Sequence, residues 1–134
     1  MRPLKEILEQ SISELGEPQR AKSCSPDTTL EDAVSMLKEA KVGSLVIVAD
    51  GSVKGIFTER DFLEKVALND VDMTKLPISS LMTPNPVCVK RHESIGSVLE
   101  KMQKGKFRHI IISDSYGHLE KVVSIREVME YLTR

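Results

Sequence analysis

The sequence predicts an α/β (α+β) fold in which two small βαββα units share one chain. The first observation is a repeat, because the apolar helical stripe that begins at Leu30 returns at Ile95, 65 residues later. The second is that helical periodicity and apolar strand-like runs alternate in the same order in both halves. The third is that half of a 134-residue chain is short for a core of its own. We therefore expect the two units to pack together with pseudo-twofold symmetry.

The segment before the first repeat has the pattern of an amphipathic helix. Its apolar side chains fall on one side at helical spacing over residues 4–15, and Gly16 and Pro18 follow as terminating residues. Along the chain we expect an N-terminal helix in residues 1–20, a first repeat in 21–70, a linker in 71–77 and a second repeat in 78–134.

The first repeat carries a separate signal for each of its elements. After an extended stretch, these signals are a capping-box pair at Thr28 and Glu31, a β-branched strand run at Leu45–Val48, a hairpin signal at Asp50-Gly51 and a returning strand in residues 53–57. The capping pair predicts a helix with Thr28 as its N-cap, and the apolar stripe predicts that this helix ends near Ala40.

The second repeat carries the same signals in the same order. The run Ile110–Ile112 matches the first strand run at the 65-residue spacing, and one extra residue in the second hairpin moves the spacing to 66. Beyond that hairpin, Ser124 corresponds to Thr58 and Glu127 to Asp61. Before this repeat, the sequence predicts a short helical segment in residues 78–82 and a short strand in residues 87–89.

The stretch Gly55-Ile56-Phe57-Thr58-Glu59-Arg60-Asp61 is the candidate functional site. It predicts a strand that runs straight into a helix, with Thr58 as the N-cap and Asp61 as the reciprocal acid. Backbone N–H groups and a hydroxyl at a helix start attract phosphate, and a carboxylate one turn later can accept bonds from two ribose hydroxyls. Gly55 lets a ligand approach the backbone. The alternative is a capping box without a ligand, which this spacing forms in many proteins.

Composition narrows the classes of function. A formal charge of −1, from 19 basic and 20 acidic residues mixed along the chain, and an aromatic content of 4% argue against a nucleic-acid partner. With no long apolar run and no secretory signal, we expect a cytoplasmic protein without a membrane partner. Cys24 and Cys88 are too few and too far apart for a disulfide framework, so we expect buried thiols. Because the histidines lack metal-ligand spacing and there is no P-loop, we expect neither a metal site nor an enzyme.

Taken together, these motifs resemble the CBS-domain family, specifically the tandem CBS pair called a Bateman module. The heptapeptide 55–61 matches the family's adenosine-nucleotide signature at every position. Residues 81–87 resemble the pattern that opens a repeat, and residues 107–112 resemble a basic pair ahead of a sheet strand. The resemblance implies that Asp61 holds ribose, that Thr58 and basic side chains hold phosphate, and that adenine lies in an apolar cleft between the repeats. It also implies that no reaction is catalysed and that an adenosine nucleotide (AMP, ADP or ATP) or the related S-adenosylmethionine or NADH is the ligand.

By the same resemblance, the basic pair of one repeat reaches the phosphate held at the other repeat's signature. Arg108 is the stronger candidate because its guanidinium is always charged, whereas His109 is only partly protonated at neutral pH. Alternatively, Arg108 and its neighbouring lysines simply favour a helix C-terminus. Arg60 is a candidate for a phosphate or dimer contact, with a solvated side chain as the alternative. The full set of candidate ligand-binding residues is Gly55, Thr58, Arg60, Asp61, Arg108, His109, Ser44 and Ser124.

The second repeat departs from the signature at two positions. Lys121 stands in place of the glycine and Glu127 in place of the acid. Glutamate carries its carboxylate about 1.5 Å further, enough to misplace a bidentate contact that needs hydrogen bonds of about 2.7 Å. We therefore expect one competent nucleotide site, built around Asp61. The alternative is that Lys121 binds phosphate and Glu127 is an adequate acceptor, which gives two sites.

The resemblance also predicts how such a module works. Modules of this family dimerise through their helices, so we expect a homodimer. No catalytic or transport domain accompanies the pair, so the regulated target is expected to be a separate protein of unknown identity. The alternative function is a ligand-free structural dimerisation or interaction module. The expected contributors to the dimer contact are Phe62, Val66, Met129 and Leu132.

Overall fold

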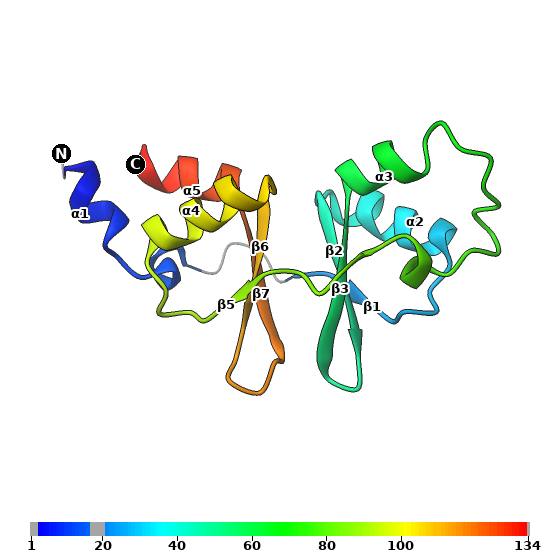
Figure 1. Ribbon diagram of the computed structural model, residues 1–134, viewed down its shortest axis with the longest axis horizontal. Coiled ribbons are helices and arrows are strands. Elements are labelled where there is room, and N and C mark those ends of the chain that lie inside the picture. Colours follow the sequence, from blue (N-terminus) through cyan, green and yellow to red (C-terminus); the bar gives the residue numbers. More distant parts are fainter. Residues whose placement is uncertain (1–2, 17–20, 134) are drawn as a thin grey trace. The chain divides into compact units, whose positions relative to one another are not determined.

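The helices and strands of the chain divide into two compact units, each of which contains a β-hairpin between two helices (Figure 1). The computed structural model describes residues 3–16 and 21–133. One unit is Ala21–Pro86, and the other combines Met1–Arg20 with Val87–Arg134. The N-terminal segment therefore belongs to the unit of the second repeat, although it precedes the first repeat in the chain.

The Ala21–Pro86 unit is a mixed four-stranded sheet with two α-helices. Its elements are β1 (Ser23–Cys24), α2 (Leu30–Ala40), β2 (Ser44–Ala49), β3 (Ser52–Thr58), α3 (Glu59–Lys65), the 3-10 helix η2 (Ile78–Ser80) and β4 (Thr83–Pro84). The strand order is β1-β2-β3-β4, with a parallel β1–β2 pair and antiparallel pairs elsewhere. The β2–β3 hairpin turns at Asp50 and Gly51, which have positive φ values of 53° and 78°, as the Asp-Gly signal predicts.

The other unit repeats this plan with a three-stranded sheet. Its elements are α1 (Leu4–Leu8), the 3-10 helix η1 (Ile12–Leu15), β5 (Cys88–Val89), α4 (Ile95–Gly105), β6 (His109–Ser113), β7 (Leu119–Ser124) and α5 (Ile125–Leu132). The strand order is β5-β6-β7, with one parallel and one antiparallel pair. The predicted α+β class, with two copies of one βαββα unit, is confirmed.

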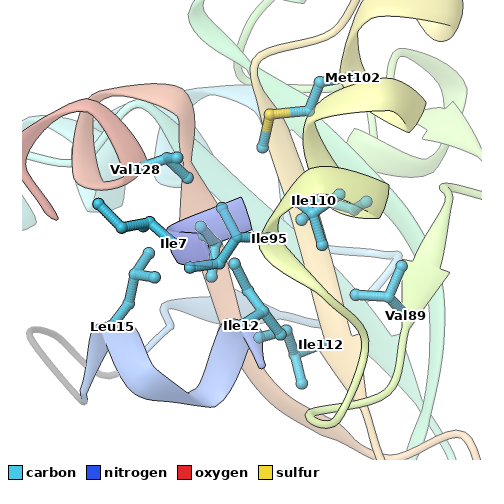
Figure 2. Packing of buried hydrophobic residues seen from close by; sticks show 11 residues of the cluster. Ile7, Ile12, Leu15, Val89, Ile95, Met102, Ile110, Ile112 and Val128 are labelled. Carbon is cyan, nitrogen blue, oxygen red and sulfur yellow. The ribbon is translucent and has the colours of Figure 1, made fainter. Parts of the chain in front are cut away.

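The core of this second unit is filled in part by the N-terminal segment. Ile7, Ile12 and Leu15 are buried and lie in one cluster with Ile95 and Val128 (Figure 2). Full burial of an aliphatic side chain of this size stabilises a fold by about 1.5–3 kcal/mol relative to an exposed position. The N-terminal segment is therefore a structural part of this unit.

The prediction of one continuous helix over residues 4–15 is wrong. The chain forms α1 and then, after a break, η1. At the break, the Gln10 carbonyl accepts a hydrogen bond from the Ile95 N–H (2.8 Å), and the Ile12 N–H donates to the Glu93 carbonyl (2.7 Å). Because these backbone groups are paired with distant residues, they do not form the bonds that would continue α1.

The middle of the chain forms the same arrangement in the other unit. The Ile78 N–H donates to the Thr28 carbonyl (2.7 Å), and both Ile78 and its counterpart Ile12 are fully buried. We call residues 10–16 and 76–82 the lead-in segments. Each lead-in segment precedes one repeat in the chain but packs in the unit that contains the other repeat.

Helix boundaries refine the predicted caps. The N-cap of α2 is Thr29, whose hydroxyl accepts a bond from the Asp32 N–H (3.2 Å), so the predicted N-cap Thr28 is wrong by one residue. Helices α2 and α4 both end on a lysine in the left-handed conformation, Lys41 (φ 55°) and Lys106 (φ 58°). Glycine is the usual residue in that conformation because it has no Cβ.

Burial differs from the prediction at two side chains. Cys24 is half-buried, but Cys88 is exposed, because alternate residues of a strand face opposite sides and β5 turns Val89 to the core. Val66 is only 5% exposed and packs in the core of its own unit, so its expected part in a dimer contact is wrong. Over the described ranges, 3–16 and 21–133, no helix has both the length and the apolar character that a membrane span requires.

Candidate functional site

The candidate site lies where β3 runs into α3, and the predicted capping box is present there. The Thr58 hydroxyl accepts a hydrogen bond from the Asp61 N–H (3.2 Å), and the Asp61 carboxylate accepts one from the Thr58 N–H (2.9 Å). The next N–H group, that of Glu59, donates to the carbonyl of Gly43 (3.1 Å). The predicted junction from strand to capped helix is therefore confirmed.

The Asp61 side chain is buried and makes more contacts than the capping box requires. The residue is 6% exposed, and its Oδ2 atom also accepts a bond from the Thr58 hydroxyl (3.2 Å). Its Oδ1 atom accepts from the Thr83 hydroxyl (3.0 Å) and lies 3.1 Å from Nζ of Lys65. The same Lys65 ammonium donates to the carbonyl of Leu81 (2.9 Å). The carboxylate therefore joins α3 to the segment that contains β4.

Gly55 is required by packing inside the unit. It lies in β3 opposite Pro84 of β4. A Cβ atom at this position would lie 2.3 Å from Sδ of Met82 and 3.0 Å from the carbonyl oxygen of Thr83. Because a Cβ does not approach a sulfur that closely, any side chain here must displace Met82. The predicted approach of a ligand to the Gly55 backbone stays a prediction.

Ser44 and Arg60 lie at the same junction. Ser44 is the cross-strand partner of Thr58 in the β2–β3 pair and is 9% exposed. Arg60 lies in the first turn of α3, with its Nε 2.9 Å from Oε1 of Glu64, and both side chains of this pair are more than half exposed. Exposed pairs of this kind contribute little to stability. The unit thus brings Ser44, Thr58 and Asp61 together, with Arg60 on the exposed side of the helix.

The other unit has the same junction between β7 and α5, with a glutamate as the acid. The Ser124 hydroxyl accepts from the Glu127 N–H (3.2 Å), and Oε1 of Glu127 accepts from the Ser124 N–H (3.4 Å). The Oε2 atom of Glu127 is buried, and no described residue offers it a hydrogen bond. Burial raises the pKa of the Glu127 carboxyl, although the Ser124 N–H and the charge of Lys121 act in the opposite direction. The longer acid completes the box but leaves one oxygen unsatisfied.

Arg108 and His109 lie where β6 begins, beside the β7–α5 junction. The Arg108 carbonyl accepts a bond from the Ile125 N–H (2.8 Å), and His109 is the cross-strand partner of Ser124. The Arg108 side chain is exposed and that of His109 is half-buried. Contact between these two residues and a phosphate stays a prediction.

Lys121, which replaces the glycine of the signature, has a partner in its own unit. Its ammonium group donates a hydrogen bond to the carbonyl of Gly16. At the 66-residue spacing, Lys121 corresponds to Gly55 and Gly16 corresponds to Met82. The first repeat's unit therefore has a small residue on the strand and a large one on the lead-in segment, and the second repeat's unit has the reverse.

Sequence reasoning missed two residues of the site, Thr83 and Lys65. Lys65 follows Asp61 by four residues, and this charge spacing on a helix was a usable signal. Thr83 had no local signal, because the pairing of β4 with β3 brings it to Asp61. Among the residues that the structure describes, no three His, Cys, Asp or Glu side chains form a cluster that could hold a metal ion.

A βαββα unit that occurs twice in one chain, with a capped acid at each strand–helix junction, defines a class of tandem-repeat protein. Comparison with known families identifies the same two repeats. The sequence profile of the CBS domain matches residues 17–68 and 78–134. The chain therefore belongs to the CBS domain family, and it contains two CBS repeats. The resemblance that the motifs indicate is confirmed.

Known proteins resemble the chain over most of its length. An uncharacterized 17.7 kDa protein of Acidianus ambivalens is 33% identical over 108 residues, which are 80% of this chain and 64% of that protein. A solved structure from Pyrococcus horikoshii has a TM-score of 0.85 at 26% identity and covers 95% of both chains. The CBS domain protein PAE2072 from Pyrobaculum aerophilum, complexed with AMP, has a TM-score of 0.79 at 25% identity, covering 92% of this chain and 99% of its own. The chain spans less than two thirds of the length of the curated relatives that it matches.

Proposed function

We propose that this protein is a regulatory module that binds an adenosine nucleotide at the β3–α3 junction of the Ala21–Pro86 unit. The observation that supports it most is the buried carboxylate of Asp61, which Thr58 holds at the start of α3 inside the signature heptapeptide. A carboxylate in this place can accept hydrogen bonds from ribose hydroxyls. The related protein PAE2072 is complexed with AMP. AMP is therefore the first ligand to test, followed by ADP, ATP, S-adenosylmethionine and NADH.

In this proposal, Asp61 accepts from the ribose and the Thr58 hydroxyl lies next to the phosphate, with Gly55 and Ser44 beside them. Arg60 is the proposed phosphate contact within the same unit, because a guanidinium binds phosphate through charge-assisted hydrogen bonds. The corresponding candidates of the other unit are Arg108, His109 and Ser124.

Asp61→Ala tests the proposal directly. Each hydrogen bond to a charged acceptor contributes about 1.5–3 kcal/mol, so the affinity for AMP should fall at least tenfold in isothermal titration calorimetry. Because Asp61 also caps α3, the variant should lose about 0.5–2 kcal/mol of stability. The titration should therefore be carried out at a temperature well below the unfolding temperature of the variant. Asp70→Ala, at an exposed position of the same unit, is the matched control and should bind AMP normally. Unchanged affinity in Asp61→Ala would overturn the proposal.

Stoichiometry tests the proposed difference between the repeats. With Lys121 and Glu127 in the second repeat, titration with AMP should give close to one ligand per chain, and Asp61→Ala should abolish the signal. The double change Lys121→Gly with Glu127→Asp should raise the stoichiometry towards two. A stoichiometry near two in the unchanged protein, with one site left in Asp61→Ala, would favour two competent sites instead.

We also propose that the module forms a homodimer and acts on a separate protein. Leu63 on α3 and Met129 on α5 are corresponding residues, and they are 66% and 53% exposed, which supports contacts through these helices. Light scattering should give the mass of a dimer at micromolar concentration, and Met129→Glu should lower it. A monomer in the unchanged protein would count against the dimer.

A ligand-free interaction module is the second candidate, and one observation favours it. The Asp61 carboxylate already accepts hydrogen bonds from Thr58 and Thr83 and forms an ion pair with Lys65 of its own chain. A thermal-shift panel with the five ligands separates the candidates, because a binding module is stabilised by at least one of them and an interaction module by none. Product analysis of the same mixtures would detect turnover by an enzyme.

A further inference from the structure

Both oxygens of the Asp61 carboxylate already have partners in their own unit. A carboxylate has about four lone-pair sites, two on each oxygen. Oδ2 accepts from the N–H and the hydroxyl of Thr58, and Oδ1 accepts from the Thr83 hydroxyl and forms an ion pair with the Lys65 ammonium, 3.1 Å away. A ribose that places both of its hydroxyls on Oδ1 must therefore replace the Thr83 hydroxyl and the Lys65 ammonium there.

The two oxygens hold donors of different kinds. Oδ2 is bonded to Thr58, which belongs to the capping box and to the start of α3. Oδ1 accepts a hydrogen bond from Thr83, which lies 22 residues further along the chain, and forms an ion pair with Lys65, whose ammonium donates to the Leu81 carbonyl. Loss of the Oδ1 contacts leaves the capping box intact. Oδ1 is thus the oxygen that can exchange its donors without ending the helix.

The second repeat shows that a capping box of this type does not require such contacts. Oε2 of Glu127 has no hydrogen-bond donor among the described residues. The residue that corresponds to Lys65 is Tyr131, and its hydroxyl donates to Oε1 of Gln10 instead (2.6 Å). The occupied carboxylate is therefore a specific property of the Ala21–Pro86 unit.

We propose that Thr83 and Lys65 compete with the ribose hydroxyls of the ligand for Oδ1 of Asp61. This inference rests on the proposed function of the site. Ligand binding must then release the Thr83 side chain and the Lys65 ammonium from Asp61. Thr83 lies in β4, whose pairing with β3 consists of two residue pairs, Gly55 with Pro84 and Ile56 with Thr83. Occupancy of the site therefore loosens the short strand that ends at Pro86, the last residue of the unit.

Thr83→Val tests the competition, because valine keeps the shape of threonine and removes the hydroxyl. In isothermal titration calorimetry, Thr83→Val should bind AMP about three- to tenfold more tightly than the unchanged protein, as expected from the loss of one competing hydrogen bond. Thr83→Ser keeps the hydroxyl and is the matched control, with an affinity close to that of the unchanged protein. Lys65→Met should likewise tighten binding of adenosine, a ligand without phosphate on which the lysine charge has no direct effect.

A ligand without ribose hydroxyls separates competition at Asp61 from a general change in the site. The gain from Thr83→Val should disappear with 2′,3′-dideoxy-AMP, which has no hydroxyl to place on Oδ1. Hydrogen exchange provides a second readout, because AMP should increase amide exchange in residues 81–86 of the unchanged protein. Greater protection of these amides by AMP would overturn the inference.

The outcomes for the inference and for the proposed function differ. If Asp61→Ala loses AMP binding while Thr83→Val binds no more tightly than the unchanged protein, the competition is overturned and the proposed function stands. An equal gain with AMP and with 2′,3′-dideoxy-AMP overturns the competition as well. If neither the unchanged protein nor Thr83→Val binds any of the five ligands or adenosine, the proposed function fails and the inference fails with it. Binding by Thr83→Val alone would support both.

Discussion

The ammonium group of Lys121 donates a hydrogen bond to the backbone carbonyl of Gly16. The corresponding positions of the other unit are occupied by Gly55 and Met82, which lie against each other. In one unit the small residue is on the strand and the large one is on the lead-in segment, and in the other unit these positions are reversed. The change on one side is matched by the change on the other, and Lys121 is joined to Gly16 by this hydrogen bond. The effect of a substitution on stability at either position should therefore depend on which residue lies opposite.

Gly55→Ala should lower the free energy of unfolding by about 1–3 kcal/mol, because the new Cβ overlaps the Met82 side chain. Met82→Ala makes room for it, so the double variant should be more stable than the sum of the single effects predicts. Urea unfolding followed by circular dichroism measures all four proteins. Strict additivity of the two substitutions would contradict this packing.

Ile12→Ala should lower the free energy of unfolding by about 2–5 kcal/mol, because Ile12 is fully buried although it lies near the start of the chain. Hydrogen exchange should show the greatest loss of protection in α4 and β6, which belong to the same unit. Ile78→Ala is the matched variant, and its greatest loss should fall in α2 and β2. A loss in Ile12→Ala that is greatest in α2 would contradict the assignment of the N-terminal segment.

Glu127→Gln should change how stability depends on pH. Burial raises the pKa of the Glu127 carboxyl in the folded state, so the fold binds this proton more tightly than the unfolded chain does. The stability that Glu127 contributes is fully present below its ordinary pKa of about 4.3 and is lost as pH rises through the raised pKa. The stability of the unchanged protein relative to Glu127→Gln should therefore fall between acidic and neutral pH in urea titrations. A rise over this interval would show that the folded state prefers the charged carboxylate.

Lys41→Gly should stabilise the protein by about 0.5–1 kcal/mol. Lys41 ends α2 at φ 55°, a left-handed backbone conformation that is strained for a residue with a Cβ atom but not for glycine. Lys41→Ala keeps the Cβ and should bring no such gain, which separates relief of backbone strain from loss of the lysine charge. Thermal unfolding of the three proteins is the measurement, and a gain in Lys41→Ala as large as that in Lys41→Gly would exclude the backbone explanation.

Local chemistry was sufficient to predict the repeat and most of its elements. The Asp50-Gly51 turn and the Thr58–Asp61 box each depend on residues at most three positions apart, so their patterns are visible in the sequence. The break after α1 was not predictable in this way. It is caused by two hydrogen bonds with the second half of the chain, one that the Gln10 carbonyl accepts from Ile95 and one that the Ile12 N–H donates to Glu93.

The candidate site likewise contains residues that local sequence predicts and residues that only tertiary structure brings there. Thr58 and Asp61 could be predicted because they follow one another within a single turn of helix. Thr83 could not, because only the pairing of β4 with β3 brings its hydroxyl to the carboxylate. The donors that already occupy Asp61 are therefore a property of tertiary structure, and no motif of the signature indicates them.

The position of the N-terminal lead-in segment has a consequence for synthesis of the protein. A nascent chain leaves the ribosome in order, at about 5–20 residues per second, and domains fold as they emerge. The Ala21–Pro86 unit is continuous in sequence, so it can fold once β4 has emerged. Ile12 emerges earlier, but its partners in β6 and α5 are translated after the whole of that unit. The apolar residues of this lead-in segment are thus made before the Ala21–Pro86 unit but buried only after it, and during that interval they are accessible to a chaperone.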